Sequence, residues 1–262
     1  MKNEYPLVTL ITPSYNQGDF IEATIKSVLS QTYPHIEYIV LDAMSNDQTE
    51  EILLKYKDQI GTTVRAKDKG QSDAIVKGFK LANGELVGWI NSDDILSPDC
   101  VQRVVKSYVE NRSSNIFYSK SVDLISKDGA KIRTFNIKEI SHESLLRKST
   151  QLIQPGSFYK KSALEAVGYL DINLKYSMDL DLWLRLLKNG SATEVPGTAL
   201  ASYREWEGTK TSTGDLRLMV ERKRLLFNHG ARFIDPTISL LNMKIFKRKI
   251  KAIFTGKIVG CL

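Results

Sequence analysis

The sequence predicts an α/β fold with an open, mostly parallel β-sheet and flanking helices. Over the first 105 residues, short β-prone runs alternate with helical patterns of about 10–15 residues, an order typical of parallel β-α-β units. Polar residues directly follow four of these strand-like runs. The chain has 262 residues, of which 42% are hydrophobic, which is enough for one large domain or two intimate halves with a buried core.

The elements of the N-terminal half follow from the spacing of apolar residues. Runs rich in β-branched and aromatic side chains predict strands at residues 7–11, 36–41, 62–65 and 86–90. Apolar residues that recur at helical spacing predict helices at about 20–29, 46–56 and 72–82. A further helix should begin at Ser97-Pro98-Asp99, because Ser and Asp are favoured as N-caps and Pro in the first turn.

The C-terminal half has a different pattern. Strands are predicted at residues 115–119 and 130–135, around the turn Lys127-Asp128-Gly129, and at 199–203. Helices are predicted at 141–148, 162–167, 179–187 and 216–227. The apolar residues of the helix at 179–187 fall on one face, so we expect Trp183 in the core.

Composition and cysteine content exclude several classes of protein. No run of 18 apolar residues is present, so we expect no membrane span. Cys100 and Cys261 lack the spacing of a disulfide framework or a metal site, which favours a reducing compartment. Strand-like sequence begins at Leu7 and leaves no room for a signal peptide, so we expect a cytoplasmic protein. Without zinc-finger spacing or an aromatic-interleaved basic patch, nucleic acid is not an expected partner.

The polar residues that follow the first four strands should meet at one edge of the sheet. These are Pro13-Ser14-Tyr15-Asn16, Asp42, Asp68 and Asp93-Asp94, in strand order. Open parallel sheets bind ligands at the carboxyl ends of their strands. Adjacent carboxylates are costly to bury unpaired, and their oxygens suit Mg²⁺ or Mn²⁺ that bridges to phosphates. The alternative is a solvated loop that leads into the helix after Asp99.

The absence of other motifs narrows the chemistry. The first strand is not followed by Gly-x-Gly-x-x-Gly, and no Walker A sequence is present, which disfavours dinucleotide oxidoreductases and P-loop phosphotransferases. No Gly-x-Ser-x-Gly is found, and His35, His142 and His229 are scattered along the chain. A nucleotide-binding sheet with a carboxylate metal site remains.

Seven ordered motifs resemble those of inverting family-2 glycosyltransferases with the GT-A fold, over about residues 5–230. They are residues 12–16, 27–34, 40–49, Asp68-Lys69-Gly70-Gln71-Ser72-Asp73-Ala74, Asn91-Ser92-Asp93-Asp94, Gln154-Pro155-Gly156 and residues 178–185. Each motif alone is weak, but their order and spacing are specific. The resemblance implies one GT-A domain over residues 1–235, with a nucleotide-sugar-binding half at about 5–105 and an acceptor and catalytic-base half at 106–235.

The resemblance also implies roles for individual residues. Pro13, Tyr15 and Asp42 should line the nucleobase pocket, with Asp68 beside it. Asp93 should lie near the ribose, and Asp94 should bind the Mn²⁺ or Mg²⁺ that bridges the donor diphosphate. The donor should be a nucleotide sugar, most simply a UDP-sugar. The acceptor should be a saccharide or a polyprenyl-linked saccharide of a bacterial surface polysaccharide.

Asp179 matches the catalytic base of the family. A sugar hydroxyl is a poor nucleophile, so a carboxylate must take its proton as it attacks the anomeric carbon. Asp179 also suits an N-cap of the helix that follows. Asp181 cannot share its face of that helix, so only one of the two should reach the acceptor. Further contacts to diphosphate or acceptor are predicted for Gln154, Asp181, Arg204 and Lys210.

Three departures from the family pattern affect the predicted site. Ala66 stands where similar chains often carry an acidic residue. Ala43-Met44 stand where similar chains carry small residues such as Gly-Gly after Asp42. Trp206 stands where similar chains often carry a His that contacts metal or phosphate, and Lys210 is one candidate for the missing charge. Two alternatives to a transferase stay open: a non-catalytic nucleotide-sugar-binding partner subunit, and a sugar nucleotidyltransferase.

Basic residues gather in a C-terminal tail at residues 236–262. The net charge of the chain is +7, and no acidic residue follows Asp235, whereas six Lys and Arg residues do. Between residues 238 and 257 these cations interleave with Leu, Ile, Met and Phe, as in helices that lie in an anionic membrane interface. The tail therefore predicts either peripheral attachment to the inner face of the cell membrane or a helix packed on the domain with a solvated basic face.

Overall fold

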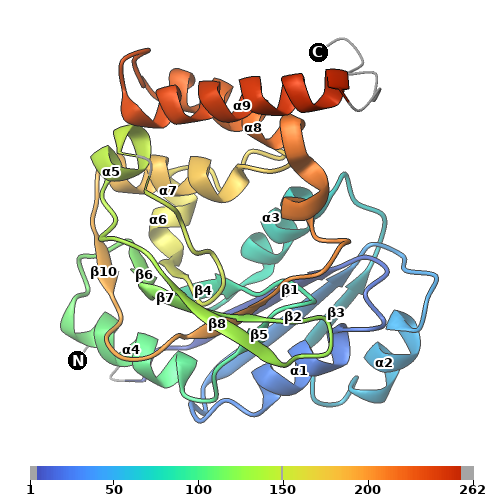
Figure 1. Cartoon of the computed structure of the whole chain (residues 1–262). Helices are drawn as coiled ribbons and strands as arrows, with labels where there is room; N and C mark the ends of the chain where they lie inside the picture. The colour runs from blue at the N-terminus through green and yellow to red at the C-terminus, as the bar shows by residue number, and fades with distance from the viewer. Residues whose placement is uncertain (1–4, 149, 255–262) are drawn as a thin grey trace.

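The computed structural model describes residues 5–148 and 150–254, and describes side chains there except at 210–215 and 251–254 (Figure 1). A seven-stranded sheet has the order β10-β6-β9-β4-β1-β2-β3. Its strands are β1 (Val8–Ser14), β2 (Ile36–Asp42), β3 (Thr62–Arg65), β4 (Leu86–Trp89), β6 (Ile116–Tyr118), β9 (Phe158–Lys160) and β10 (Ala192–Glu194). Only β9 runs antiparallel to its neighbours β4 and β6, so the predicted mostly parallel sheet is confirmed.

A second, four-stranded sheet lies beside the first. Its order is β5-β11-β7-β8, made of β5 (Ile95–Leu96), β11 (Ala201–Arg204), β7 (Ser121–Ile125) and β8 (Lys131–Asn136). β5 follows the Asp93-Asp94 pair, and β11 pairs with it antiparallel, with Ser202 opposite Ile95. This sheet therefore brings a segment more than 100 residues away against the end of β4.

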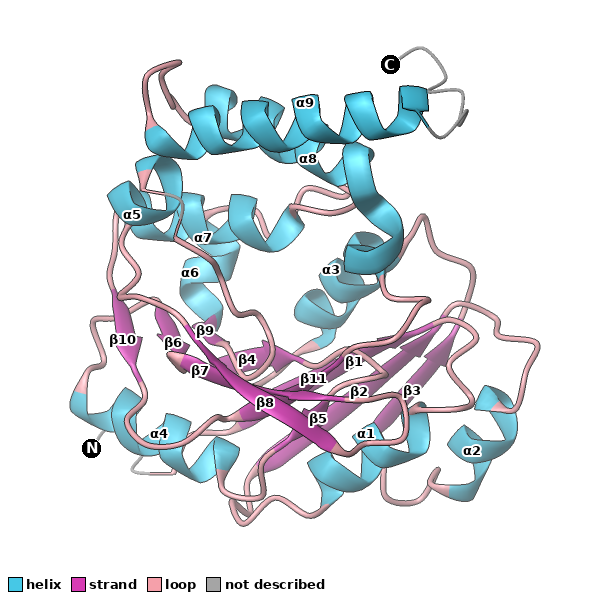
Figure 2. Ribbon diagram, viewed as in Figure 1, coloured by secondary structure: helices cyan, strands magenta, loops and turns pink. Residues whose placement is uncertain are grey.

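Helices cover both faces of the large sheet (Figure 2). On one face lie α1 (Ile21–Leu29), α2 (Thr49–Lys55) and α4 (Cys100–Glu110). The other side carries α3 (Gln71–Leu81), α5 (His142–Arg147), α6 (Lys161–Ala166) and α7 (Met178–Lys188). Two long helices, α8 (Lys210–Asn228) and α9 (Pro236–Phe254), cross over this second layer.

The strand periodicity explains why the sheet is covered on both faces. Successive side chains of a strand point to opposite faces. Leu10 and Val40 accordingly join the core with α1 and α4, whereas Ile11 joins the core with α3 and α7. Trp183 is fully buried, and its indole N–H donates to the Tyr159 hydroxyl at 2.9 Å, so the prediction that Trp183 belongs to the core is confirmed.

The turn at residues 127–129 joins β7 to β8, and the two strands predicted on either side of it do not pair with each other. Both predicted strands form, but β8 pairs with β7, whereas β6 lies in the large sheet between β9 and β10. β7 was not predicted, because its polar, half-exposed Ser121 and Asp123 interrupt the run of apolar residues. β9 and β10 were not predicted either, because a strand of three residues is too short to show an alternation of apolar and polar residues.

The predicted C-terminal tail is helical and packs on the domain at its start. Ile238 and Leu241 of α9 are buried in the core, whereas Met243, Phe246 and Ile250 are exposed. In the described part of the chain, no helix is both long enough and apolar enough to span a bilayer. Residues 255–262 of the predicted tail lie outside the described residues.

Candidate active site

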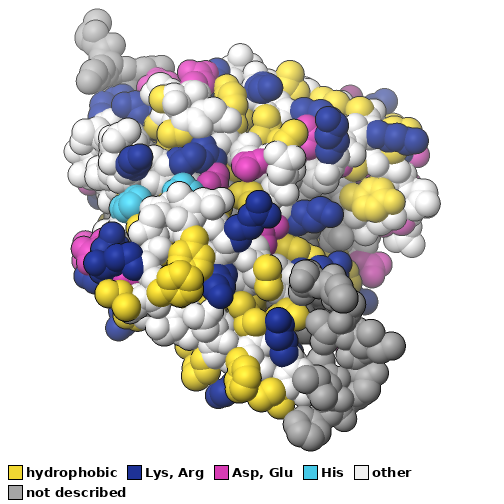
Figure 3. All heavy atoms as spheres, turned by 90° about the horizontal axis from the view of Figure 1, so that it is seen from above, with side chains coloured by type: hydrophobic (Ala, Val, Ile, Leu, Met, Phe, Trp, Pro, Cys, Tyr) yellow, Lys and Arg dark blue, Asp and Glu magenta, His cyan; other side chains and the backbone are white. Residues whose placement is uncertain are grey.

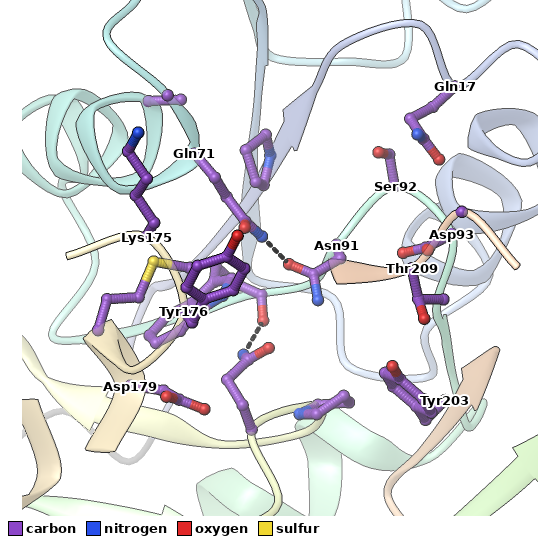
Figure 4. Close-up of a pocket in the computed structure, with 18 of the residues that line it drawn as sticks. Gln17, Gln71, Asn91, Ser92, Asp93, Lys175, Tyr176, Asp179, Tyr203 and Thr209 are labelled. Atoms are coloured by element: carbon purple, nitrogen blue, oxygen red, sulfur yellow. Dashed lines mark hydrogen bonds between the residues drawn. The ribbon is translucent and has the colours of Figure 1, made fainter. Parts of the chain in front are cut away.

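A large cavity opens where the carboxyl ends of the parallel strands meet α3, α7 and α8. Its volume is about 1150 Å³, and it is lined from the sheet by Pro13, Trp89 and Asp93 and from the helical layer by Tyr176 and Asp179. Figure 4 shows Asp93 and Asp179 on opposite sides of this space. The predicted convergence of polar groups at one sheet edge is thus what the structure shows.

The end of the cavity next to β1 and β3 contains most of the predicted donor residues. Pro13, Tyr15 and Asp68 line it, and Tyr15 is 60% exposed. The carboxylate of Asp68 accepts the Gly70 N–H at 2.8 Å, which fixes the turn before α3. Met44 also lines this end, with a positive φ of 62°, so the departure Ala43-Met44 forms part of its wall.

Asp42 lies behind this wall and not in it. Its side chain is buried and forms an ion pair with Arg65 at 2.9 Å. It also accepts the Ser45 N–H at 3.1 Å and the Ser45 hydroxyl. A buried carboxylate must be paired in this way. Asp42 therefore fixes the turn that presents Ala43 and Met44 to the cavity.

Asp93 is the carboxylate of the pair that faces the cavity. The Trp206 indole N–H donates to its Oδ2 at 3.0 Å, and Arg204 Nε donates to its main-chain oxygen at 2.8 Å. Burial raises the pKa of Asp93, although the bond from Trp206 opposes this. Trp206 itself packs against Phe20 with ring centroids 4.8 Å apart. The residue in place of the expected His thus holds the cavity-facing carboxylate.

Asp94 does not face the cavity, which differs from the predicted placement. It is fully buried, and its Oδ1 accepts the Arg204 N–H at 3.0 Å while its Oδ2 accepts from the Asn91 side chain at 3.0 Å. Burial and the neighbouring Asp93 raise its pKa well above the ordinary range. Asp93 and Asp94 lie in a tight turn after β4, closed by a bond from the Asp94 N–H to the Asn91 main-chain oxygen at 3.1 Å, and Asp94 ties this turn to β11.

Arg204 also lies away from the cavity. Its guanidinium donates to the main-chain oxygens of Asp93, Ser126 and Lys127 at 2.8–3.1 Å and lies over the Phe20 ring. These contacts explain its burial, and they differ from the predicted diphosphate contact. Gln154 does line the cavity, where it donates to the Trp89 main-chain oxygen at 2.9 Å. The Lys210 side chain lies outside the described residues.

Asp179 reaches the cavity from the first turn of α7. The N-cap of this helix is Ser177 and not Asp179. Burial raises the pKa of Asp179, whereas the positive charge of Arg222 on α8 and the Leu180 N–H at 2.8 Å lower it. A carboxylate with a raised pKa is a stronger base at neutral pH. Asp179 therefore has the position and the environment of a proton acceptor.

Asp181 points to the other side of α7, as its spacing predicts. It is paired with Arg185 at 2.6 Å and with His229 at 2.8 Å. These bonds lower its pKa even though burial opposes them. Asp181 is thus a tie between α7 and the end of α8, and it does not line the cavity.

Glu221 and Arg222, which sequence analysis missed, support the α7 side of the cavity from α8. The Glu221 carboxylate accepts the main-chain N–H groups of residues 175–177 at 2.7–2.9 Å. Arg222 lines the cavity, and its buried Nε has no hydrogen-bond partner in the described part of the chain. In sequence, charged residues 221–224 resemble the solvated face of an amphipathic helix, so only the position of α8 could reveal their role.

A family model described as "Glycosyl transferase family 2" matches residues 9–168. The chain belongs to this family. It is 32% identical over 210 residues to the putative teichuronic acid biosynthesis glycosyltransferase TuaG of Bacillus subtilis, and the match covers 78% of this chain and 81% of TuaG. The prediction of a family-2 glycosyltransferase is confirmed.

Solved structures of similar fold confirm the GT-A architecture of this family-2 glycosyltransferase. S. aureus TarS 1-349 in complex with UDP-GlcNAc has a TM-score of 0.68 and 17% identity, over 94% of this chain and 72% of TarS. The mannosyltransferase PcManGT of Pyrobaculum calidifontis, in complex with GDP-Man and Mn²⁺, has a TM-score of 0.63 and 17% identity, over 98% of this chain and 76% of PcManGT.

Proposed function

We propose that this family-2 glycosyltransferase transfers a sugar from a UDP-sugar to a saccharide or lipid-linked saccharide, with inversion, in the synthesis of a bacterial surface polysaccharide. The observation that carries the proposal is the placement of Asp93 and Asp179 on opposite sides of one cavity. The name of TuaG supports the polysaccharide, and the UDP-GlcNAc complex of TarS supports the donor.

The donor nucleotide would occupy the end of the cavity next to β1 and β3. Tyr15 and Pro13 offer apolar surface to a base, and Asp68 offers a hydrogen-bond acceptor. Asp42 would act through the turn that it holds with Ser45 and Arg65, and not by direct contact. Met44 lines this end of the cavity, so it bears on which base and ribose fit there.

The residues present fit a divalent cation that is held mainly by substrate phosphates. Mg²⁺ and Mn²⁺ commonly take one or two protein carboxylates and complete their shell with phosphate and water oxygens. Asp93 supplies one cavity-facing carboxylate, whereas both oxygens of Asp94 are bonded inside the protein. We therefore assign the cation to Asp93 in place of Asp94. A bound cation would offset the charge that develops on the leaving diphosphate.

Asp179 would take the proton of the acceptor hydroxyl. A single displacement with one base inverts the configuration at the anomeric carbon, because the acceptor attacks opposite the leaving diphosphate. Asp93 and Asp179 on facing walls match this geometry. A cavity-facing base also weighs against a non-catalytic partner subunit, and membership of family 2 weighs against a nucleotidyltransferase.

Donor hydrolysis against a panel of nucleotide sugars tests the proposal. The full chain with Mn²⁺ should release UDP slowly from one or two UDP-sugars, and removal of the cation with EDTA should stop the release. Asp179→Asn serves as the control for hydrolysis by a contaminant. Failure of every nucleotide sugar in the panel to bind or to be hydrolysed would overturn the proposal.

A further inference from the structure

A second, smaller cavity adjoins the Asp179 side of the active site. Its volume is about 310 Å³, and Phe135, Gln151 and Arg222 line both cavities. Its other walls come from the segment after β8, from the end of α5 and from α9. We call it the basic groove, because its charged lining consists of Lys138, Lys148, Arg222 and Lys244.

The groove is built for negative charge. Among the described residues, no Asp or Glu lines it. Lys148 forms an ion pair with Glu143 at 3.3 Å, but both side chains are more than 60% exposed, so the pair is screened by solvent. A concentration of like charges around a concave surface raises the local concentration of anions.

Arg222 provides the second, independent sign of a ligand. Its Nε is buried and lacks a hydrogen-bond partner within the described residues, although a buried donor without a partner costs about 1–3 kcal/mol. Burial lowers the pKa of its guanidinium, and Asp179 is the group that opposes this shift. A guanidinium with an unpaired, buried donor can form strong, directional hydrogen bonds to a phosphate that enters the groove.

The apolar part of the groove indicates what carries the anion. Leu240 and Leu241 of α9 line the groove next to Lys244. Farther along the same helix, Met243, Phe246 and Ile250 are exposed, with Phe246 at 64%. At about 100° per residue, these three residues lie on another side of α9 from Leu240 and Lys244. The apolar wall of the groove is therefore formed by Ile137, Leu240 and Leu241, which suits a molecule that carries a hydrocarbon chain next to a phosphate.

We propose that the basic groove binds the phosphate of a polyprenyl-linked acceptor, with the lipid chain along α9 and the acceptor sugar directed toward Asp179. The proposal rests on the proposed glycosyl transfer and adds to it a binding site for the lipid-linked acceptor. Arg222 contacts both cavities, so it would hold the phosphate next to the acceptor hydroxyl.

Calorimetric titration of the full chain with farnesyl phosphate tests this site. Saturating UDP and Mn²⁺ are present throughout, so that the probe cannot enter the donor site. Binding should occur, weaken as salt is raised, and weaken about tenfold or more in Arg222→Gln and in the double variant Lys138→Gln/Lys244→Gln. Lys106→Gln, an exposed lysine of α4, should bind like the wild type.

Two further probes separate the sources of binding. Farnesol lacks the charge and inorganic phosphate lacks the chain, so each should bind at least tenfold more weakly than farnesyl phosphate. Equal affinity for farnesol, equal affinity for inorganic phosphate, or unchanged binding in both variants would overturn the proposal. If Arg222→Gln does not fold, the double lysine variant decides, since both lysines are exposed. Failure of the wild type to bind UDP would instead refute the proposed glycosyl transfer.

Discussion

Asp93 and Asp94 are adjacent in the chain, but their surroundings give them different chemistry. Asp93 meets the cavity and one indole N–H, so it keeps free acceptor capacity toward a ligand. Asp94 has both oxygens bonded to protein groups and no exposed surface. An ionised carboxylate is a ligand for a hard cation only where the cation can reach it.

Asp93→Asn should remove the response to divalent cations. Turnover at saturating donor should fall about 10²-fold or more, because stabilisation of the leaving diphosphate is lost. Asp94→Asn keeps the size of the side chain and should lower the melting temperature while turnover still rises with Mn²⁺. A Mn²⁺ titration of turnover in both variants measures this. If Asp94→Asn loses the Mn²⁺ response and Asp93→Asn keeps it, the assignment is reversed.

Asp179→Asn should keep donor affinity while turnover falls about 10²-fold or more, the scale of a lost general base. Calorimetry with UDP and single-turnover transfer measure the two quantities separately. Asp58→Asn, at an exposed position outside the cavity, is the matched control. Normal turnover in Asp179→Asn would show that another group takes the proton.

At the scale of elements, α8 controls the position of α7. Glu221 gathers three main-chain N–H groups just before α7, and His229 at the other end of α8 bonds to Asp181. These three N–H groups belong to the segment that leads into α7, where no regular secondary structure pairs them, and a carboxylate satisfies them well. The two contacts fix α7 at two points and with it the direction of Asp179.

Glu221→Gln should lower kcat about tenfold and leave the donor KM nearly unchanged. A neutral amide accepts these N–H bonds less strongly and brings its own N–H₂ against them, so Asp179 loses its fixed orientation. Steady-state kinetics at varied donor concentration separates the two constants. Glu165→Gln, an exposed residue of α6, is the control. Equal losses in both variants, or a change confined to KM, would contradict a positioning role.

The tie at Asp181 should be visible in the pH dependence of stability. The pKa of Asp181 is lower in the folded protein than in the unfolded chain, where it is about 3.9. The Asp181 carboxylate therefore stabilises the fold fully above about pH 3.9, and this stabilisation is lost as the pH falls through the folded-state pKa. Asp181→Asn should therefore cost about 2 kcal/mol of unfolding free energy at pH 7. The difference from wild type should shrink below about pH 4. Urea unfolding at pH 7 and pH 3.5 measures it, and an equal difference at both pH values would refute the ion-pair origin.

The helices and long strands could be predicted because each carries several turns or alternations of pattern. The helix predicted at 216–227 lies inside α8, and the strand predicted at 36–41 lies inside β2. The pairing of β8 could not be predicted, because it depends on contacts and not on local pattern. The same holds in the site. Asp93 and Asp179 were predicted from motifs, but the packing of the folded chain decides that Arg222 lines the cavity and that Asp94 does not.

At the scale of the whole molecule, basic and apolar side chains lie together on the surface of the α8–α9 end. Figure 3 looks down on this end and shows Lys and Arg side chains interspersed with hydrophobic ones. Ile238 and Leu241 anchor α9 in the core, so the predicted packed helix is confirmed for its first turns. Its exposed part still has the composition of a membrane-surface helix. The two predicted alternatives for the tail are therefore compatible.

The exposed part of α9 should attach the enzyme to anionic membranes. Lys and Arg residues contribute about 1 kcal/mol each near such a surface, and buried apolar side chains add to this. Phe246→Gln/Ile250→Gln removes apolar surface without touching the core residues Ile238 and Leu241. Leu54→Gln, at a 61% exposed site on α2, is the matched control.

Co-sedimentation with vesicles that contain anionic lipid measures the attachment. Wild type and Leu54→Gln should pellet with anionic vesicles at low salt and remain in solution with neutral vesicles. The double α9 variant should pellet several-fold less, and its UDP affinity should match the wild type, because α9 lies outside the donor end of the cavity. Attachment places Asp179 beside a lipid-linked acceptor, so transfer to that acceptor should fall in the double variant while donor hydrolysis does not. Equal pelleting of all three proteins, or pelleting that salt does not reduce, would show that α9 serves only to pack the domain.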